Sequence, residues 1–256
     1  MVEDLERKGK RMLTDTHNIP RLIHYCWFGR GEKPRKIEMC IKSWYKHLGD
    51  YQFMEWNEDN FDISSNLYVK QAYEAKKYAF VSDYVRLYAL YHYGGIYMDT
   101  DVEVIKPLDR FLHHTAFSGF EDETYLQSGT MGAVQGHPWI EELMNHYHNR
   151  RFVLSDGTLD TTTNTAMMTN NGDKHGLQLN GRYQVLDNGV TFYPRTYFSP
   201  YDYINGANYL TEESYTIHHF AKSWLPAHVR IRGEIKKWVG RYIGPRFVAR
   251  MRTIFK

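Results

Sequence analysis

The sequence predicts an α/β domain with a mostly parallel central sheet and helices on both faces. In the first hundred residues, short apolar runs alternate with longer segments of helical periodicity, which is the pattern of strand–helix units. Glycine-rich turns follow the first run, at Gly29-Arg30-Gly31, and precede the third, at Gly94-Gly95. The chain of 256 residues is 42% hydrophobic and 24% charged, as in ordinary globular proteins, and it is long enough to bury a large core.

The first elements each have a local signal. The run 21–28 is almost entirely apolar and predicts a buried strand, and 51–56 predicts a second one. Apolar residues at helical spacing predict a helix over 35–48 and two more over 67–77 and 79–93. The Gly-Gly turn ends the last of these helices.

The rest of the chain continues the same architecture. A strand over 96–105 follows the Gly-Gly turn, Pro138 marks the first turn of a helix over 137–149, and Asn188-Gly189 indicates a hairpin. Residues 153–176 are polar and predict a long binding loop around a short helix. Further strands are expected at 115–120, 129–134, 183–193 and 216–220.

Two carboxylates, Asp99 and Asp101, follow the apolar run that begins at Ile96. Side chains alternate along a strand, so a continuous strand would place both on one face. Two neighbouring carboxylates repel each other unless a cation or hydrogen-bond donors lie between them, and oxygen ligands suit Mg²⁺ or Mn²⁺. The pair therefore indicates a metal–diphosphate site, and the alternative is a solvated turn.

Composition limits the class of protein. The aromatic content of 16%, with 21 Tyr, favours a polar cleft lined by rings, although Tyr also fills cores. Cys26 and Cys40 are expected to be buried thiols rather than a disulfide framework. We expect no signal peptide and no membrane-spanning run, and a cytoplasmic location is the default.

The C-terminal residues 229–256 differ from the rest. They contain nine Lys/Arg and one acid, Glu234, and their apolar residues fall at helical spacing. A basic amphipathic helix of this kind suits an anionic membrane surface, and the alternatives are packing on its own domain or contact with nucleic acid. We therefore divide the chain into an extension (1–18), a main globular domain (19–226) and a basic tail (227–256), and we expect no nucleic-acid partner.

Four segments together resemble the family 32 glycosyltransferases, which contain a DXD sugar-binding region. They are Ile23 to Gly29 in the first strand, Val81 to Arg86, Gly94 to Asp101, and His218 to Trp224. The resemblance spans about residues 19 to 226. It implies a GT-A-like fold and transfer of a hexose from a nucleotide sugar, with a UDP-sugar as the expected donor and Mn²⁺ or Mg²⁺ as cofactor.

The resemblance also implies roles for individual residues. Asp101 would bind the metal directly and Asp99 would contact the ribose, the sugar or the metal through water. A third ligand would come from His219, which we prefer, or from His218. Donor-binding roles are implied for Trp27 (stacking on the base), Ser82 (near the base), Asp83 and Arg86 (sugar and sugar-phosphate), Tyr97 (near the sugar), and Ser223 and Trp224 (over the diphosphate).

The family retains the anomeric configuration, and double displacement would require a carboxylate nucleophile. We cannot assign one, because Glu121, Asp122 and Glu123 are expected in an exposed turn. The resemblance implies front-face displacement, in which Asp83 and Arg86 would act at the donor sugar. From its place in the polar loop, we add Asn164 to this catalytic set as a candidate group beside the transferred sugar. Lys222 departs from the family, in which glycine often precedes the final Ser-Trp.

The expected acceptor is a surface glycan or lipid-linked glycan, as in capsule or lipopolysaccharide synthesis, at the inner face of the membrane. Two alternatives remain open. A sugar nucleotidyltransferase would need a basic phosphate loop, of which 29–33 is a faint version. A non-catalytic carbohydrate-binding module would leave the gathered acids and histidines unexplained.

Overall fold

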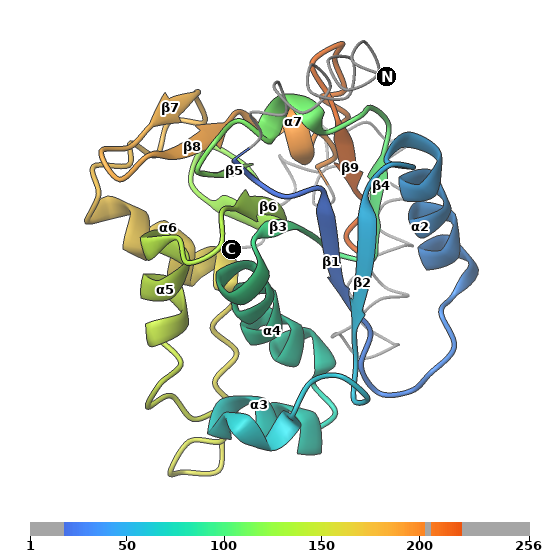
Figure 1. The fold of residues 1–256 in the computed structure, drawn as a ribbon. Coiled ribbons are helices and arrows are strands. Elements are labelled where there is room, and N and C mark those ends of the chain that lie inside the picture. Colours follow the sequence, from blue (N-terminus) through green and yellow to red (C-terminus); the bar gives the residue numbers. More distant parts are fainter. Residues whose placement is uncertain (1–17, 203–205, 222–256) are drawn as a thin grey trace, which may run out of the picture.

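The computed structural model describes residues 18–202 and 206–221, and a seven-stranded sheet forms its centre (Figure 1). The strands of this sheet lie in the order β2-β1-β3-β6-β5-β8-β7, and β4 and β9 pair separately. The strands are β1 (Leu22–Cys26), β2 (Gln52–Trp56), β3 (Gly95–Met98), β4 (Val102–Val104), β5 (Ala116–Phe120), β6 (Leu126–Ala133), β7 (Gln184–Val185), β8 (Val190–Tyr193) and β9 (Thr216–His218). The helices are α2 (Arg35–His47), α3 (Leu67–Glu74), α4 (Tyr78–Tyr93), α5 (Pro138–Asn145), α6 (Asn164–Asp173) and α7 (Arg195–Phe198), with short 3₁₀ turns η1 (Ile63–Ser65) and η2 (Asp109–Phe111).

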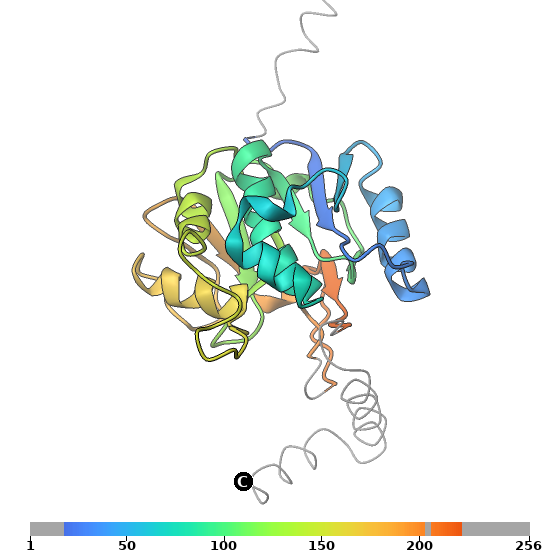
Figure 2. The same cartoon turned by 90° about the horizontal axis from the view of Figure 1, so that it is seen from below.

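The predicted α/β class with a mostly parallel sheet is confirmed. Strands β2, β1, β3, β5 and β8 run in one direction, and β6 and β7 run in the other. Helix α2 and the α5–α6 pair lie at opposite ends of the molecule (Figures 1 and 2). Because β1, β2 and β3 are parallel, the loops that follow them open at one edge of the sheet, where α/β proteins bind ligands.

Each face of the sheet buries its own core. On one face, α4 packs on β1 and β3, and its buried residues include Val81 and Val85. On the other face, Trp44 of α2 packs with Ile96 and Met98 of β3, and Trp44 Nε1 donates a hydrogen bond of 2.7 Å to the Val102 carbonyl. The strand alternation therefore sends neighbouring residues of β3 into two different cores.

The predicted Gly-Gly turn connects α4 to β3 and depends on both glycines. Gly94 has φ +64° and Gly95 has φ +106°, which are conformations that side-chain-bearing residues rarely adopt. A Cβ atom at Gly95 would lie 2.4 Å from the Leu22 carbonyl oxygen of β1. The turn thus places β3 beside β1, and the Asp pair follows directly after the carboxyl end of β3.

The single strand expected over 96–105 is wrong. Strand β3 ends at Met98, and a turn closed by a 3.0 Å hydrogen bond from Val102 N to the Asp99 carbonyl leads into β4. Strand β4 then pairs with β9 rather than with the large sheet. Asp99 and Asp101 therefore lie on a turn between two sheets, so alternation along one strand is not what brings them together.

Other boundaries also differ from the predictions. The short helix expected near 163–168 continues to Asp173 as α6, and α7 was not predicted. The helix expected over 137–149 ends at Asn145. Residues 1–17 and the basic tail lie outside the described residues. Among the helices that the structure describes, none combines the length and apolarity of a transmembrane span.

The buried imidazole of His24 in β1 is expected to make the folded protein less stable in acid. Its ring is fully buried, Trp56 donates to Nδ1 at 3.1 Å, and Nε2 lies 2.8 Å from the Gly94 carbonyl. Burial lowers the pKa of His24 from 6.5 to about 4, against the raising effect of the Gly94 contact. Between these pH values the unfolded chain binds the proton and the folded chain does not, so His24 should cost about 3 kcal/mol of stability as the pH falls from 6.5 to 4.

Urea unfolding at pH 7 and pH 4.5 checks this expectation. The variant His24→Gln should show a smaller difference between the two pH values than the wild type, and the exposed control His148→Gln should match the wild type. An unchanged pH dependence in His24→Gln would contradict a buried neutral imidazole.

Candidate active site

Two carboxylates and one imidazole converge at the edge of the sheet. Asp99 and Asp101 lie on the β3–β4 turn, and His218 ends β9, whose antiparallel register places it opposite Val102. One ligand atom from each of the three residues lies within 4.8 Å of the others. His218 Nε2 is 3.2 Å from Asp101 Oδ1 and 3.9 Å from Asp99 Oδ2.

This group fits a divalent cation. Two carboxylate oxygens and an imidazole nitrogen are a donor set for Mn²⁺ or Mg²⁺ together with substrate oxygens. The Nδ1 atom of His218 is buried and has no hydrogen-bond partner. Burial would lower the pKa of His218, but the charge and hydrogen bond of Asp101 outweigh it and raise the pKa to about 9. Without a metal, protonated His218 therefore offsets the negative charge of the two carboxylates, and a bound cation would take over this role.

The preference for His219 over His218 is corrected by the strand register. Successive residues of an extended segment point to opposite sides, so only one of the two rings faces the Asp pair. The ring of His219 turns away, and its Nε2 lies 2.9 Å from Glu103 Oε2. His219 contributes only its backbone here, because its N–H donates to the Asp101 carbonyl at 3.1 Å.

A buried ion network lies beside the Asp pair. Arg86 Nη2 lies 2.8 Å from Asp83 Oδ1 and 3.3 Å from Asp99 Oδ1, and Nη1 donates to the Ser128 carbonyl at 2.6 Å. The guanidinium covers the ring of Tyr97 at 4.6 Å, and the Tyr97 hydroxyl donates to Asp99 Oδ1 at 3.0 Å. Four residues predicted to bind the donor therefore form one connected group.

The electrostatics of this group depend on Arg86. Burial raises the pKa of Asp83 to about 6, and the positive charge of Arg86 acts against that rise. The Arg86 side chain is only 5% exposed and stays charged, because its pKa is raised by Asp99, Tyr97 and Asp83 in spite of burial. Arg86 is thus the counter-charge for both neighbouring carboxylates.

Asn164 supports this network from inside the protein, and its side chain is used up by contacts with Asp83 and Tyr147. It is fully buried at the start of α6, its Nδ2 donates to the Asp83 carbonyl at 2.7 Å, and its Oδ1 accepts from the Tyr147 hydroxyl at 2.6 Å. The expectation that Asn164 lies beside the sugar is therefore corrected, because both ends of its amide are used inside the protein. It positions Asp83.

The remaining predicted donor residues lie around the same edge. Trp27 follows β1 and is half-buried, with Nε1 donating to the Gly31 carbonyl at 2.6 Å and Lys33 Nζ 5.4 Å from the ring. Ser82 is half-buried and its hydroxyl donates to the Tyr78 carbonyl at 3.1 Å. Ser223 and Trp224 lie outside the described residues.

The loop after β1 does not form a phosphate cradle. The backbone N–H of Gly29 donates to Glu58 Oε1 at 2.6 Å, and Arg30 pairs with Asp59 at 2.6 Å. Acidic side chains thus already occupy the donors that a nucleotidyltransferase would direct at its substrate phosphates.

Two residues near the metal group were missed from the sequence. Glu121, expected in an exposed turn, is half-buried at the end of β5, where burial raises its pKa and the nearby charge of His218 opposes the rise. Gly129 lies inside β6, and its carbonyl accepts the Asp99 N–H at 2.9 Å. A glycine inside a strand often marks a close approach, and this was the available signal for Gly129.

Gly129→Ala is expected to weaken Mn²⁺ binding by about 10- to 100-fold, as for changes that displace metal ligands. A Cβ atom at Gly129 would lie 2.9 Å from His218 Nδ1 and 3.1 Å from Asp99 Oδ2, so both groups would have to move. Isothermal titration with MnCl₂ measures the effect. Gly49→Ala is the matched control, since a Cβ there meets its nearest atom at an ordinary 3.5 Å; equal losses in both variants would contradict the packing argument.

Comparison with known proteins agrees with this geometry. Residues 34–118 match the family described as the glycosyltransferase sugar-binding region containing the DXD motif. The inositol phosphoceramide mannosyltransferase 3 of Schizosaccharomyces pombe is 30% identical over 132 residues, which cover 50% of this chain and 37% of the relative. An uncharacterised glycosyltransferase of Acanthamoeba polyphaga mimivirus is 25% identical over 83% of this chain and 86% of its own.

Among solved structures, a glycosyltransferase involved in glycosylation of the major capsid of PBCV-1 has a TM-score of 0.46 and 10% identity over 84% of this chain and all of its own. The chain spans less than half the length of the fission yeast relative. The family match contains Asp83, Arg86 and the Asp pair that the structure brings together. Over residues 34–118 the chain is therefore similar to the glycosyltransferases whose sugar-binding region contains the DXD motif.

Proposed function

We propose that this protein is a metal-dependent, retaining hexosyltransferase that uses a nucleotide-sugar donor. The observation that carries the proposal is the placement of Asp99, Asp101 and His218 next to the buried Arg86–Asp83 pair. A cation group beside an arginine–aspartate pair suits a donor that carries a diphosphate at one end and sugar hydroxyls at the other.

Different residues bind different parts of the proposed donor. Asp101 and His218 would hold Mn²⁺ or Mg²⁺, which when bound acts as a Lewis acid toward the leaving diphosphate. Asp83 accepts hydrogen bonds from sugar hydroxyls, and Arg86 keeps Asp83 and Asp99 oriented. Tyr97 fixes Asp99 through its hydroxyl.

Retention of the anomeric configuration is proposed from the family resemblance, and the way Asp83 is held bears only on the route by which retention is reached. A carboxylate nucleophile must be free to attack the anomeric carbon, but both oxygens of Asp83 have partners: Oδ1 with Arg86 and Oδ2 with the Asn164 N–H at 3.4 Å. We therefore favour front-face displacement with retention, in which the departing phosphate accepts the proton of the acceptor hydroxyl.

For the donor and the acceptor, we propose only a class of molecule. A UDP-hexose remains the expected donor, and the mannosyltransferase relatives favour mannose as a second choice of sugar. The expected acceptor is a surface glycan or lipid-linked glycan. The relatives named for inositol phosphoceramide support a lipid-borne acceptor.

A screen of sugar nucleotides tests the proposal. UDP-hexoses and GDP-mannose are incubated with the protein and Mn²⁺, and release of the nucleoside diphosphate is followed with and without EDTA. One donor should be hydrolysed slowly in a metal-dependent manner. Pyrophosphate release from a nucleoside triphosphate, or glycan binding without donor turnover, would instead favour one of the two alternative functions.

The membrane location is a separate proposal. Residues 229–256, which lie outside the described residues, contain nine Lys/Arg and one acid. Such a segment would hold the enzyme at the anionic inner face of the membrane, near a lipid-linked acceptor. Cosedimentation with anionic vesicles, with and without residues 227–256, measures this directly, and equal binding would remove the proposal.

A further inference from the structure

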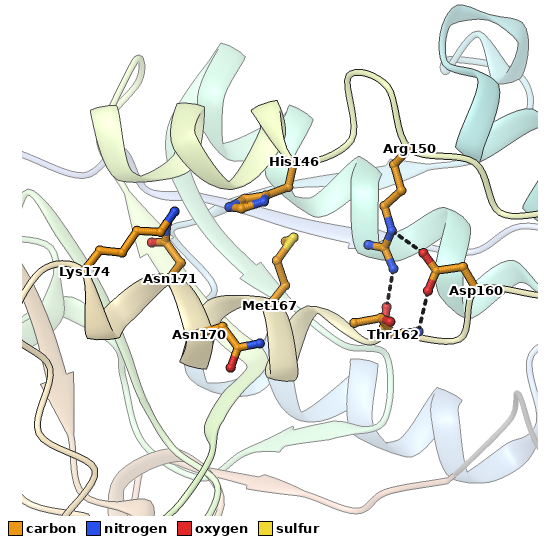
Figure 3. A pocket seen from close by; sticks show the side chains of 8 residues that line it. All are labelled: His146, Arg150, Asp160, Thr162, Met167, Asn170, Asn171 and Lys174. Carbon is orange, nitrogen blue, oxygen red and sulfur yellow. Dashed lines mark hydrogen bonds and ion pairs between the residues drawn. The ribbon is translucent and has the colours of Figure 1, made fainter. Parts of the chain in front are cut away.

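A cavity of about 250 Å³ lies between the end of α5 and helix α6, and none of its lining residues belongs to the metal group (Figure 3). Met167 reaches its middle from α6, and His146 stands opposite, next to the end of α5. Arg150, Asp160 and Thr162 close one side, while Asn171 and Lys174 stand at the other.

The amide of Asn171 is the unusual feature of this cavity. The residue is 1% exposed, and its Oδ1 has no hydrogen-bond partner. Its amide nitrogen is near the Glu142 carboxylate, where burial would raise the pKa but hydrogen bonds to His175 and Asn171 lower it. A buried polar group without a partner is costly, and native structures retain few of them. Asn171 Oδ1 therefore needs a partner that supplies a hydrogen-bond donor.

The opposite side of the cavity also presents donors and acceptors together. Arg150 Nε pairs with Asp160 Oδ2 at 2.7 Å, and Arg150 Nη2 donates to the Thr162 carbonyl at 2.9 Å (Figure 3). The rings of Tyr68 and Tyr147 lie 4.7 and 5.1 Å from the guanidinium carbon, so Arg150 is held firmly. The positive charge of Arg150 is thereby offset by Asp160.

These features distinguish between two kinds of ligand. A phosphate is anionic and mainly accepts hydrogen bonds, so it is poorly matched to Asn171 Oδ1 and would be repelled by the carboxylates of Asp160 and Glu142. A hydroxyl both donates and accepts, and several hydroxyls on one ring can serve both sides of the cavity. Met167 adds an apolar surface suited to the C–H face of a sugar ring.

We propose that this cavity binds a neutral sugar residue of the acceptor glycan. The link to the reaction is α6 itself, because Asn164 at its start holds Asp83 while Met167 and Asn171 face the cavity. The acceptor role rests on the proposed transferase function, whereas sugar binding by the cavity can be observed without donor or metal.

The test is a ¹H–¹⁵N NMR titration of the full chain with methyl α-D-mannopyranoside, and separately with inorganic phosphate. The glycoside should shift the Asn171 side-chain signals and the amides of α6, with millimolar saturation, and phosphate should not. Asn171→Leu should weaken glycoside binding about tenfold, as expected when a ligand hydroxyl loses its buried partner. Its melting temperature, measured alongside, shows that the fold is retained.

Two lysine variants supply matched controls. Lys174 lines the cavity, while Lys70 is a surface residue of α3 paired with Glu74. Lys174→Ala should weaken glycoside binding, and Lys70→Ala should leave it unchanged. Phosphate binding in place of the glycoside, or glycoside shifts that Asn171→Leu does not alter, would overturn the proposal. Binding of Mn²⁺ and UDP by the wild-type protein is measured separately. Loss of that binding would contradict the transferase proposal, and loss of glycoside binding would contradict the cavity proposal.

Discussion

Arg86→Met is expected to destabilise the fold by about 3–5 kcal/mol and to abolish sugar transfer. The side chain is 5% exposed and is the counter-charge for Asp83 and Asp99, at 2.8 and 3.3 Å. Removing one partner of a buried ion pair leaves the other charge without compensation, which costs more than the pair contributes. Methionine preserves most of the volume, so the loss would reflect charge and hydrogen bonds rather than an empty space.

Urea unfolding of the metal-free protein measures the stability change, and product formation measures transfer. Arg86→Lys should rescue little of either, because a single ammonium cannot reach Asp83, Asp99 and the Ser128 carbonyl together. The matched control is Arg30→Met, which breaks an exposed pair with Asp59 and should leave the unfolding free energy unchanged. Similar stability in the Arg86 and Arg30 variants would contradict the role given to Arg86.

Asp101→Asn is expected to lower transfer by on the order of 10³-fold, corresponding to the several kcal/mol that a metal ion supplies to a departing phosphate. Asp101 Oδ1 lies 3.2 Å from His218 Nε2, and Oδ2 accepts the Ala221 N–H at 2.6 Å. The amide keeps the size of the side chain but loses the charge, so metal affinity should fall far more than stability.

Steady-state assays at saturating Mn²⁺, together with titration of the metal, separate these effects. Asp59→Asn is the control, because it removes a carboxylate that is 70% exposed and lies on the loop after β2. It should transfer sugar at the wild-type rate. If Asp101→Asn did the same, Asp101 would be a turn residue with no part in metal binding.

Local patterns in the sequence predicted most of the fold that positions the site. Helical spacing of apolar residues located α2 and α4 to within a residue or two, and the apolar run 21–28 located β1. The Gly94-Gly95 turn was predicted because its conformational need is local. These signals require only residues that are close in the chain.

Site residues were predicted where their spacing was also local. Asp83 and Arg86 lie three residues apart on α4 and share a face, and the structure places them 2.8 Å apart. Tyr97, Asp99 and Asp101 were predicted to belong to the same site because their segment follows the Asp83–Arg86 segment in the order seen in the family. By contrast, Gly129 and Glu121 take their meaning from His218, which lies far from both in the sequence.

The sequence alone determined the α/β class, the order of most elements and the carboxylates that gather at the sheet edge. Only the tertiary structure decided that the Asp pair lies on a turn between two sheets and that His218 faces it while His219 pairs with Glu103. It also decided that Asn164 supports Asp83 from the interior. The physical reason is that these outcomes depend on the register of β9 against β4, across more than a hundred residues, and on burial, neither of which a local period encodes.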